Sequence, residues 1–170
     1  MRQNLTNPNW SHLDLETAIG NAIDNYQSAE VLPLHQETAC RDSFTRKFPA
    51  MSERTKKPTS TYNCHGLVFG SRRTQIDDPE VVRKILDDDG YKQIKHEKVR
   101  AGDIILYIVD GDIEHSGIVV EPANSRNLNQ TMVVSKWGTF TEVHHPHHQC
   151  PYDSSIVEYY RIGACADETI

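Results

Sequence analysis

The chain has 170 residues, a formal net charge of −6 at pH 7 and a hydrophobic content of 37%. A chain of this length can bury a substantial core as one unit, so we expect a single domain over residues 1–170. The acidic balance argues against a nucleic-acid partner, because no basic face dominates. No apolar run approaches the roughly 20 residues that a membrane span needs. Residues 1–6 lack the apolar segment of a secretory signal, so we expect a cytoplasmic protein or export without a cleaved signal.

The N-terminal part, residues 1–61, is expected to be helical and irregular. Ser11 is a suitable helix cap, and apolar residues then recur at helical spacing, which predicts a helix from Ser11 to about Tyr26. Residues 29–61 are polar and contain three prolines. They predict a long irregular segment with a short helix around Ser43–Phe48, and loops of such length are often functional.

Regular elements are expected from residue 77 onward. Asp77-Asp78-Pro79-Glu80 combines a cap residue, a proline in the first turn and acids near the positive end of the helix dipole, which predicts a helix ending at Asp89-Gly90. Strands are predicted at residues 91–96, 104–109, 115–121, 131–137 and 157–162. Helices followed by a run of antiparallel strands predict an α+β domain.

Cys64 has the most unusual setting of the four cysteines. It follows polar residues and precedes the apolar run Leu67-Val68-Phe69, which predicts a cysteine at the start of a helix. The helix dipole favours thiolate there, so we expect a pKa below the free value of about 8.5. Gly66 permits close approach of another segment or a substrate. A buried structural cysteine is the alternative, and Cys40, Cys150 and Cys165 are expected to be free thiols.

His115 is the second candidate, at the mouth of an apolar strand. The small residues Ser116 and Gly117 leave room for its ring to face another element. A histidine that takes the proton of a cysteine is the core of a nucleophilic site, and only the tertiary fold can bring His115 to Cys64. His65 is a poorer base, because adjacent helical side chains diverge.

These motifs together resemble the NlpC and CHAP branches of the papain-like cysteine peptidases. The resemblance covers residues 61–160 and rests on Cys64, on Gly-Asp-Ile-Ile-Leu-Tyr at 102–107 and on His-Ser-Gly-Ile-Val-Val at 115–120. It implies a helical N-terminal part packed on a small antiparallel, barrel-like sheet, with residues 62–162 as the catalytic core. It also implies a cofactor-free hydrolase that cleaves a peptide or amide bond, commonly in bacterial cell-wall peptides, with Cys64 as nucleophile and His115 as base.

The third catalytic position departs from the family pattern. The family usually places a His, Asn, Gln, Asp or Glu on the strand after the histidine, whereas this chain offers Ser135, a weak orienting group. Lys136 cannot accept a hydrogen bond when charged and is expected to face the other side, in packing or surface charge. His145 or Glu121 could take the role instead, or the site is a dyad.

Other site residues are predicted around this pair. The backbone N–H of Cys64, with Asn63 or Tyr62, is expected to bind the oxyanion, and Trp137 to line a substrate groove. The run His144–His148 beside Cys150 contains zinc-binding residue types, but the histidines are adjacent and no second cluster accompanies them. We therefore expect a solvated loop and no metal. The rival functions are a non-catalytic binding module or toxin-type effector on the same fold and, more remotely, a zinc hydrolase.

Overall fold

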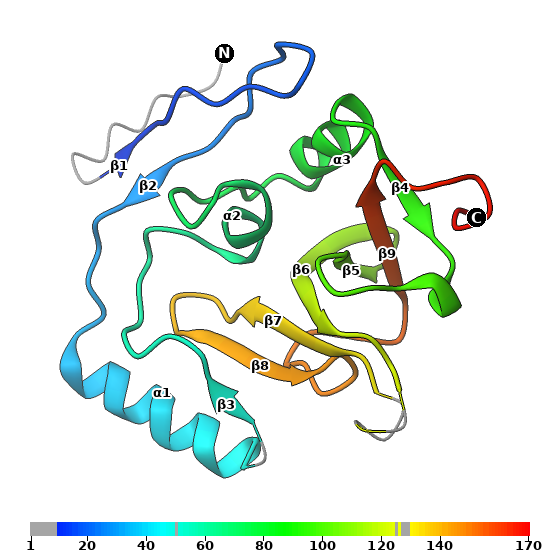
Figure 1. The fold of residues 1–170 in the computed structure, drawn as a ribbon. Helices are drawn as coiled ribbons and strands as arrows, with labels where there is room; N and C mark the ends of the chain where they lie inside the picture. Colours follow the sequence, from blue (N-terminus) through cyan, green and yellow to red (C-terminus); the bar gives the residue numbers. More distant parts are fainter. Residues whose placement is uncertain (1–9, 50, 125, 127–129) are drawn as a thin grey trace.

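The structure is a computed structural model that describes residues 10–49, 51–124, 126 and 130–170. These residues form an α+β fold in which helices pack on a seven-stranded antiparallel sheet (Figure 1). The α+β class predicted from the sequence is confirmed. Residues 1–6, on which the expectation about a secretory signal depends, lie outside the described residues.

The helical elements are α1 (Leu34–Lys47), α2 (Cys64–Phe69), α3 (Pro79–Asp88) and the 3-10 turn η1 (His96–Lys98). The strands are β1 (Trp10–Ser11), β2 (Gln27–Ser28), β3 (Ser52–Glu53), β4 (Tyr91–Ile94), β5 (Ile104–Val109), β6 (Asp112–Glu121), β7 (Met132–Lys136), β8 (Glu142–Pro146) and β9 (Val157–Ile162). The strands β1 and β2 pair separately, and the sheet has the order β3-β8-β7-β6-β5-β9-β4.

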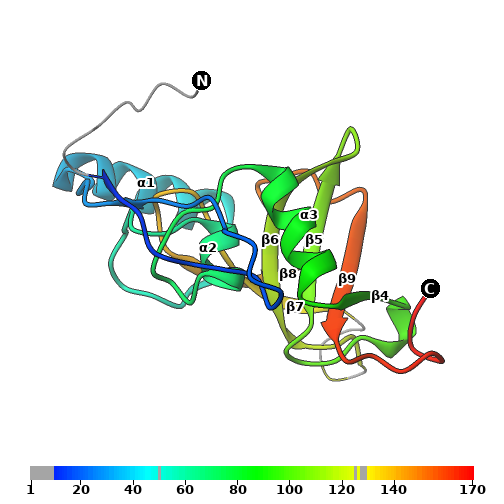
Figure 2. The same cartoon turned by 90° about the horizontal axis from the view of Figure 1, so that it is seen from above.

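Both faces of the sheet are buried at its centre. Ile104, Ile118 and Val134 lie in one register row and face α2 and α3, which form the helix face. The next side chains along each strand point to the opposite face, where Tyr107 pairs with His115. Figure 2 shows α3 alongside β5 and β6, with α1 at the far end from β4.

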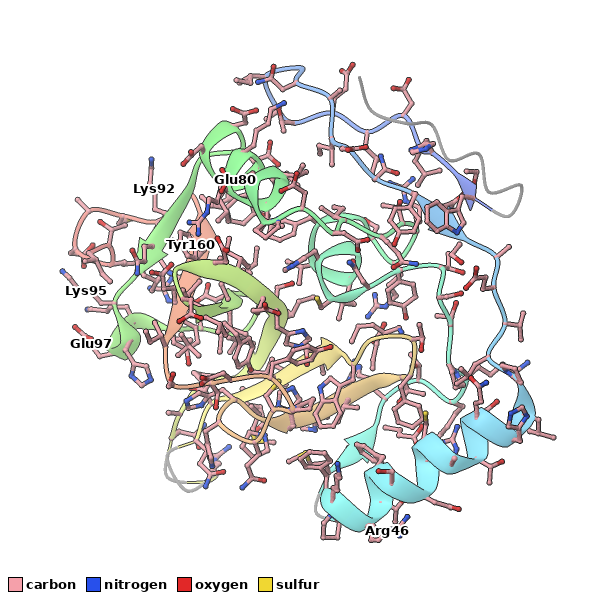
Figure 3. The ribbon with its side chains drawn as sticks, turned by 180° about the vertical axis from the view of Figure 1, so that it is seen from behind. Arg46, Glu80, Lys92, Lys95, Glu97 and Tyr160 are labelled. Atoms are coloured by element: carbon pink, nitrogen blue, oxygen red, sulfur yellow. The ribbon has the colours of Figure 1, made fainter. Side chains whose placement is uncertain are left out.

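The predicted barrel-like closure is wrong, because the sheet is open. Its two edges are β3 and β4, which lie at opposite ends of the sheet (Figure 1) and do not pair within the described part of the chain. A barrel needs its edge strands to hydrogen-bond to each other. The C-terminal segment covers the β4 edge, because the Ile170 N–H donates to the Gln93 carbonyl at 3.2 Å and the Lys95 N–H to the Glu168 carbonyl at 2.8 Å. Lys92, Lys95 and Glu97 point outward beside this edge in Figure 3.

The predicted helix from Ser11 to Tyr26 is also wrong. This segment is extended and turns at Gly20, whose φ is +85°, a conformation that a helix cannot contain. The Asn25 side chain accepts from the Leu13 N–H at 3.1 Å and donates to the Leu13 carbonyl at 3.0 Å. An asparagine that binds backbone groups in this way competes with the helix.

The segment 29–61 is less irregular than predicted, because it contains the 14-residue helix α1 in place of a short helix at Ser43–Phe48. Only Phe44 of α1 is buried, so the sequence has no apolar stripe that reveals the helix. The strand β8 was also missed, within the histidine run. In contrast, α3 begins at Pro79 after an Asp78 cap as predicted, and strands occur at all five predicted places.

Candidate functional site

Cys64 is the first residue of α2, as predicted. The Asn63 side chain caps this helix by accepting a hydrogen bond from the Gly66 N–H at 2.8 Å. A Cβ atom on Gly66 would lie only 1.7 Å from the Thr74 carbonyl oxygen. Gly66 therefore serves close approach of another chain segment, and the start of α2 is fixed from two sides.

Asn63 and Tyr62, the side chains predicted to bind the oxyanion, donate their hydrogen bonds to other groups of the protein. Asn63 donates both amide hydrogens, to the Ile76 carbonyl and to Asp77, each at 2.8 Å. The Tyr62 hydroxyl donates to the buried Glu142 carboxylate at 2.7 Å. Both residues therefore hold the cysteine-bearing loop in place, and the backbone N–H of Cys64 remains the candidate oxyanion donor.

The His115 side chain, which pairs with Tyr107 of β5, points to the sheet face opposite the helices. It is 0% exposed, and its ring stacks on Tyr152 with centroids 3.9 Å apart and planes at 12°. Neither ring nitrogen has a hydrogen-bond partner among the described residues. Buried polar atoms are almost always paired, so an imidazole left without a partner requires an explanation.

The expected hydrogen bond between Cys64 and His115 is not formed in this structure, because both imidazole nitrogens are without a partner there. Ser116, the next residue on β6, points to the helix face and hydrogen-bonds His65 of α2 at 2.9 Å. Burial raises the pKa of Cys64, and hydrogen bonding to Ser116 partly opposes that rise. The start of α2 is therefore seated on the helix face of β6 through Ser116, while the preceding residue, His115, points to the opposite face.

The pKa of Cys64 is opposite to the prediction. Burial raises the pKa of its thiol to about 11, which outweighs the hydrogen bonds from Ser116 and from the helix start. A six-residue helix supplies only a weak dipole against this desolvation. Burial also lowers the pKa of His65 to about 4 and lowers the pKa of His115, which the charges of neighbouring histidines depress further. At neutral pH the Cys64 thiol and the imidazoles of His65 and His115 are consequently uncharged.

Ser135 and His145 bond to each other, and neither is bonded to His115. The Trp137 indole N–H donates to the Ser135 hydroxyl at 3.0 Å, and Ser135 lies 2.8 Å from His145 Nε2. His145 Nδ1 lies 2.8 Å from the Pro146 carbonyl, so Nδ1 carries the proton and Nε2 accepts from Ser135. The three side chains therefore form a chain of hydrogen bonds that runs from Trp137 through Ser135 to His145. Glu121 is exposed at the far end of β6.

Two surface hollows are lined by predicted site residues, one by Cys64 and the other by Trp137. One, of about 300 Å³, is lined by Cys64 together with acidic residues, namely Asp77, Asp112 and Glu114. The other, of about 250 Å³, lies between α1 and the end of β7 and is lined by Trp137 with Phe44, Phe48 and Phe140. Trp137 therefore does line a groove, although it is 8% exposed and packs mainly as core.

Lys136 occupies the face opposite Ser135, as expected, but it is fully buried instead of carrying surface charge. Its ammonium donates to the carbonyls of Thr59 at 2.9 Å, Gly138 at 2.5 Å and Phe140 at 3.1 Å. Burial lowers its pKa to about 8. Lys136 thus ties the loop after β7 to the segment that leads into Cys64.

The histidine run is part of β8 and the turn that follows, where successive side chains alternate between faces. No group of three potential metal ligands lies together in the described part of the chain. All four cysteines are free, with Cys40 and Cys165 exposed. Tyr152 is a site neighbour that the sequence did not single out, because it belongs to no recognisable motif.

No protein-family model matches this sequence, and no curated protein or solved structure is significantly similar to it. Within the residues that the structure describes, there is no helix with the length and apolar character needed to cross a membrane. The function of this protein is therefore inferred from the geometry of the site.

Proposed function

We propose that this protein is a cysteine hydrolase of the papain-like, NlpC/CHAP-like kind, which cleaves a peptide or amide bond with Cys64 as nucleophile and His115 as base. The main support is His115 itself, a fully buried imidazole with two unpartnered nitrogens beside the strand position that seats Cys64. An unpaired buried group costs about 1–3 kcal/mol, and a free ring nitrogen is what a general base requires.

The order of elements also supports the proposal. Cys64 opens α2, β5 follows with the Gly-Asp-Ile-Ile-Leu-Tyr motif, and β6 carries His115. β5 and β6 are antiparallel neighbours, and α2 packs on β6 and β7. This arrangement matches the helix-and-strand order that the resemblance implies, whereas the open sheet does not match its barrel.

The uncharged resting state suits a mechanism in which proton transfer accompanies attack. Cys64 Sγ bonds to the substrate carbonyl carbon while its proton moves to His115, and the backbone N–H of Cys64 receives the oxyanion. The His115 imidazolium then protonates the leaving amine as the C–N bond breaks, which leaves a thioester. Water, deprotonated by His115, cleaves the thioester and restores the thiol. Four free thiols fit a reducing compartment, and we place the reaction in the cytoplasm.

The proposal is tested with a peptidyl acyloxymethyl ketone, which alkylates cysteines that have a working base. We expect the probe to label Cys64, and Cys64→Ala or His115→Ala to abolish labelling, whereas Cys165→Ala, which removes an exposed thiol, leaves labelling unchanged. Mass spectrometry of the labelled peptides identifies the site. Labelling confined to Cys40 and Cys165, or unaffected by His115→Ala, would contradict a hydrolase.

One observation favours the alternative of a non-catalytic binding module. The pKa of Cys64 is raised to about 11 by burial, and no hydrogen bond joins the thiol to His115 in this structure. A module that has lost its chemistry would show the same neutral pair. The two functions differ in the probe experiment, because a binding module does not react through His115.

A further inference from the structure

The segment between β8 and β9 brings one aromatic ring directly onto His115. Tyr152 stacks face to face on the imidazole, with centroids 3.9 Å apart and planes at 12°. Tyr107 contacts the same imidazole at 5.3 Å and 50°. The only ring contacts of His115 among the described residues are thus with two tyrosines, one from the sheet and one from the loop.

No hydrogen bond fixes the plane of the His115 ring. Both its nitrogens are without partners, and the Ser135 hydroxyl is directed to His145 instead. An imidazole that must accept a proton from a thiol needs a defined orientation, which a third polar residue usually supplies. Stacking on Tyr152 is the closest ring contact that restricts rotation of this imidazole.

Tyr152 is itself held in place. It is half-buried, and hydrogen bonding to the Gly138 backbone counteracts the rise in its pKa, which reaches about 12 through burial first and the charge of Cys64 second. Partial burial and the stacking contact therefore hold the face of the Tyr152 ring against His115, independently of the hydroxyl.

We propose that Tyr152 is the positioning residue of the site: its stacked ring sets the plane of His115 and replaces the orienting residue that the third strand lacks. This inference depends on the proposed function, because it assigns Tyr152 an effect on proton transfer to His115. It requires the aromatic ring and does not require the phenolic hydroxyl.

The test compares Tyr152→Leu, which removes the ring, with Tyr152→Phe, which keeps it. The rate of Cys64 carbamidomethylation by iodoacetamide is followed by mass spectrometry from neutral to alkaline pH. At about pH 7 we expect Tyr152→Leu to slow the reaction about tenfold and Tyr152→Phe to stay within about twofold of the unmodified protein. Near pH 11, where the thiol ionises without a base, all three should react alike.

The matched control is Tyr160→Leu, which removes another half-buried tyrosine, on β9. Strand β5 separates β9 from β6, and Tyr160 pairs with Ile104 of β5 whereas His115 pairs with Tyr107. This control should leave the pH profile unchanged even where it lowers the melting temperature. Loss of reactivity at every pH in Tyr152→Leu would indicate misfolding and contradict a positioning role. A faster reaction would show that the ring covers His115 and does not hold it, which also overturns the inference.

The His115→Ala variant separates this inference from the proposed function. If His115→Ala slows Cys64 at neutral pH and Tyr152→Leu does not, the base is real and Tyr152 has no part in it. If neither variant changes the profile, the proposed function fails as well. NMR relaxation of the His115 ring carbons gives an independent readout: a rigid ring in the unmodified protein and in Tyr152→Phe, and a more mobile ring in Tyr152→Leu.

Discussion

At the scale of single residues, burial governs the chemistry of the site more than helix position does. Cys64 occupies a helix start with an asparagine cap, yet its pKa is raised to about 11 by desolvation. In the proposed mechanism the base must therefore accept the proton during attack, because little thiolate exists at neutral pH. The importance of His115 follows from this, and so does the need to hold its ring.

Lys136 is expected to be a large contributor to stability. Lys136→Met keeps the apolar stem but leaves the three carbonyls that the ammonium binds without their donor. The Phe140 carbonyl keeps a hydrogen bond from the Thr59 N–H at 3.4 Å and Gly138 is exposed, which leaves the Thr59 carbonyl as the main acceptor to lose its donor. A buried acceptor without a partner costs about 1–3 kcal/mol, so we expect a loss of that size in urea unfolding. The exposed Lys92→Met is the matched control and should change stability by less than about 0.5 kcal/mol. Equal effects of the two substitutions would show that the buried ammonium is not a structural link.

At the scale of elements, α2 depends on its cap more than α3 does. Asn63 caps α2 and also bonds Ile76 and Asp77, whereas Asp78 caps α3 through a single bond to the Glu80 N–H at 3.0 Å. We expect Asn63→Ala to cost about 2 kcal/mol or more and Asp78→Ala about 1 kcal/mol. Thermal unfolding measures both changes. A larger loss from Asp78→Ala would contradict the dual role of Asn63.

The elements that the sequence predicted well are those with local signals. The Asp-Asp-Pro-Glu start of α3 and the β-branched run of β5 carry their own caps and periodicity. In contrast, α1 buries only Phe44, and the residues of β8 include a histidine pair. Their structure comes from contacts with distant segments, so a local pattern could not reveal them.

At the scale of the whole molecule, buried neutral histidines make stability depend on pH. Burial lowers the pKa of His65 and of His145 from 6.5 to about 4. The unfolded chain binds protons at these sites below pH 6.5 and the folded chain does not, so stability is present above this pH and is lost as the pH falls toward 4. Between pH 7 and pH 5 we expect a loss of about 2 kcal/mol for each histidine.

This pH dependence is measured by urea unfolding at several pH values. His65→Gln or His145→Gln should each make the dependence shallower, whereas replacement of the exposed His35 on α1 should leave it unchanged. A stability that stays constant from pH 7 to pH 5 would mean that these histidines are not buried in the neutral form.

The sequence by itself determined the α+β class, the helix start at Cys64 and the strand that carries His115, because caps, turns and apolar periodicity are local properties of the chain. Only the tertiary structure decided the charge state of Cys64, the pairing of Ser135 with His145 and the stacking of Tyr152 on His115. The pKa, the hydrogen bond and the stacking all depend on atoms from distant parts of the chain, which exclude water from these side chains or contact them. Desolvation and packing are sums over neighbours that are far apart in sequence, and no short motif encodes them.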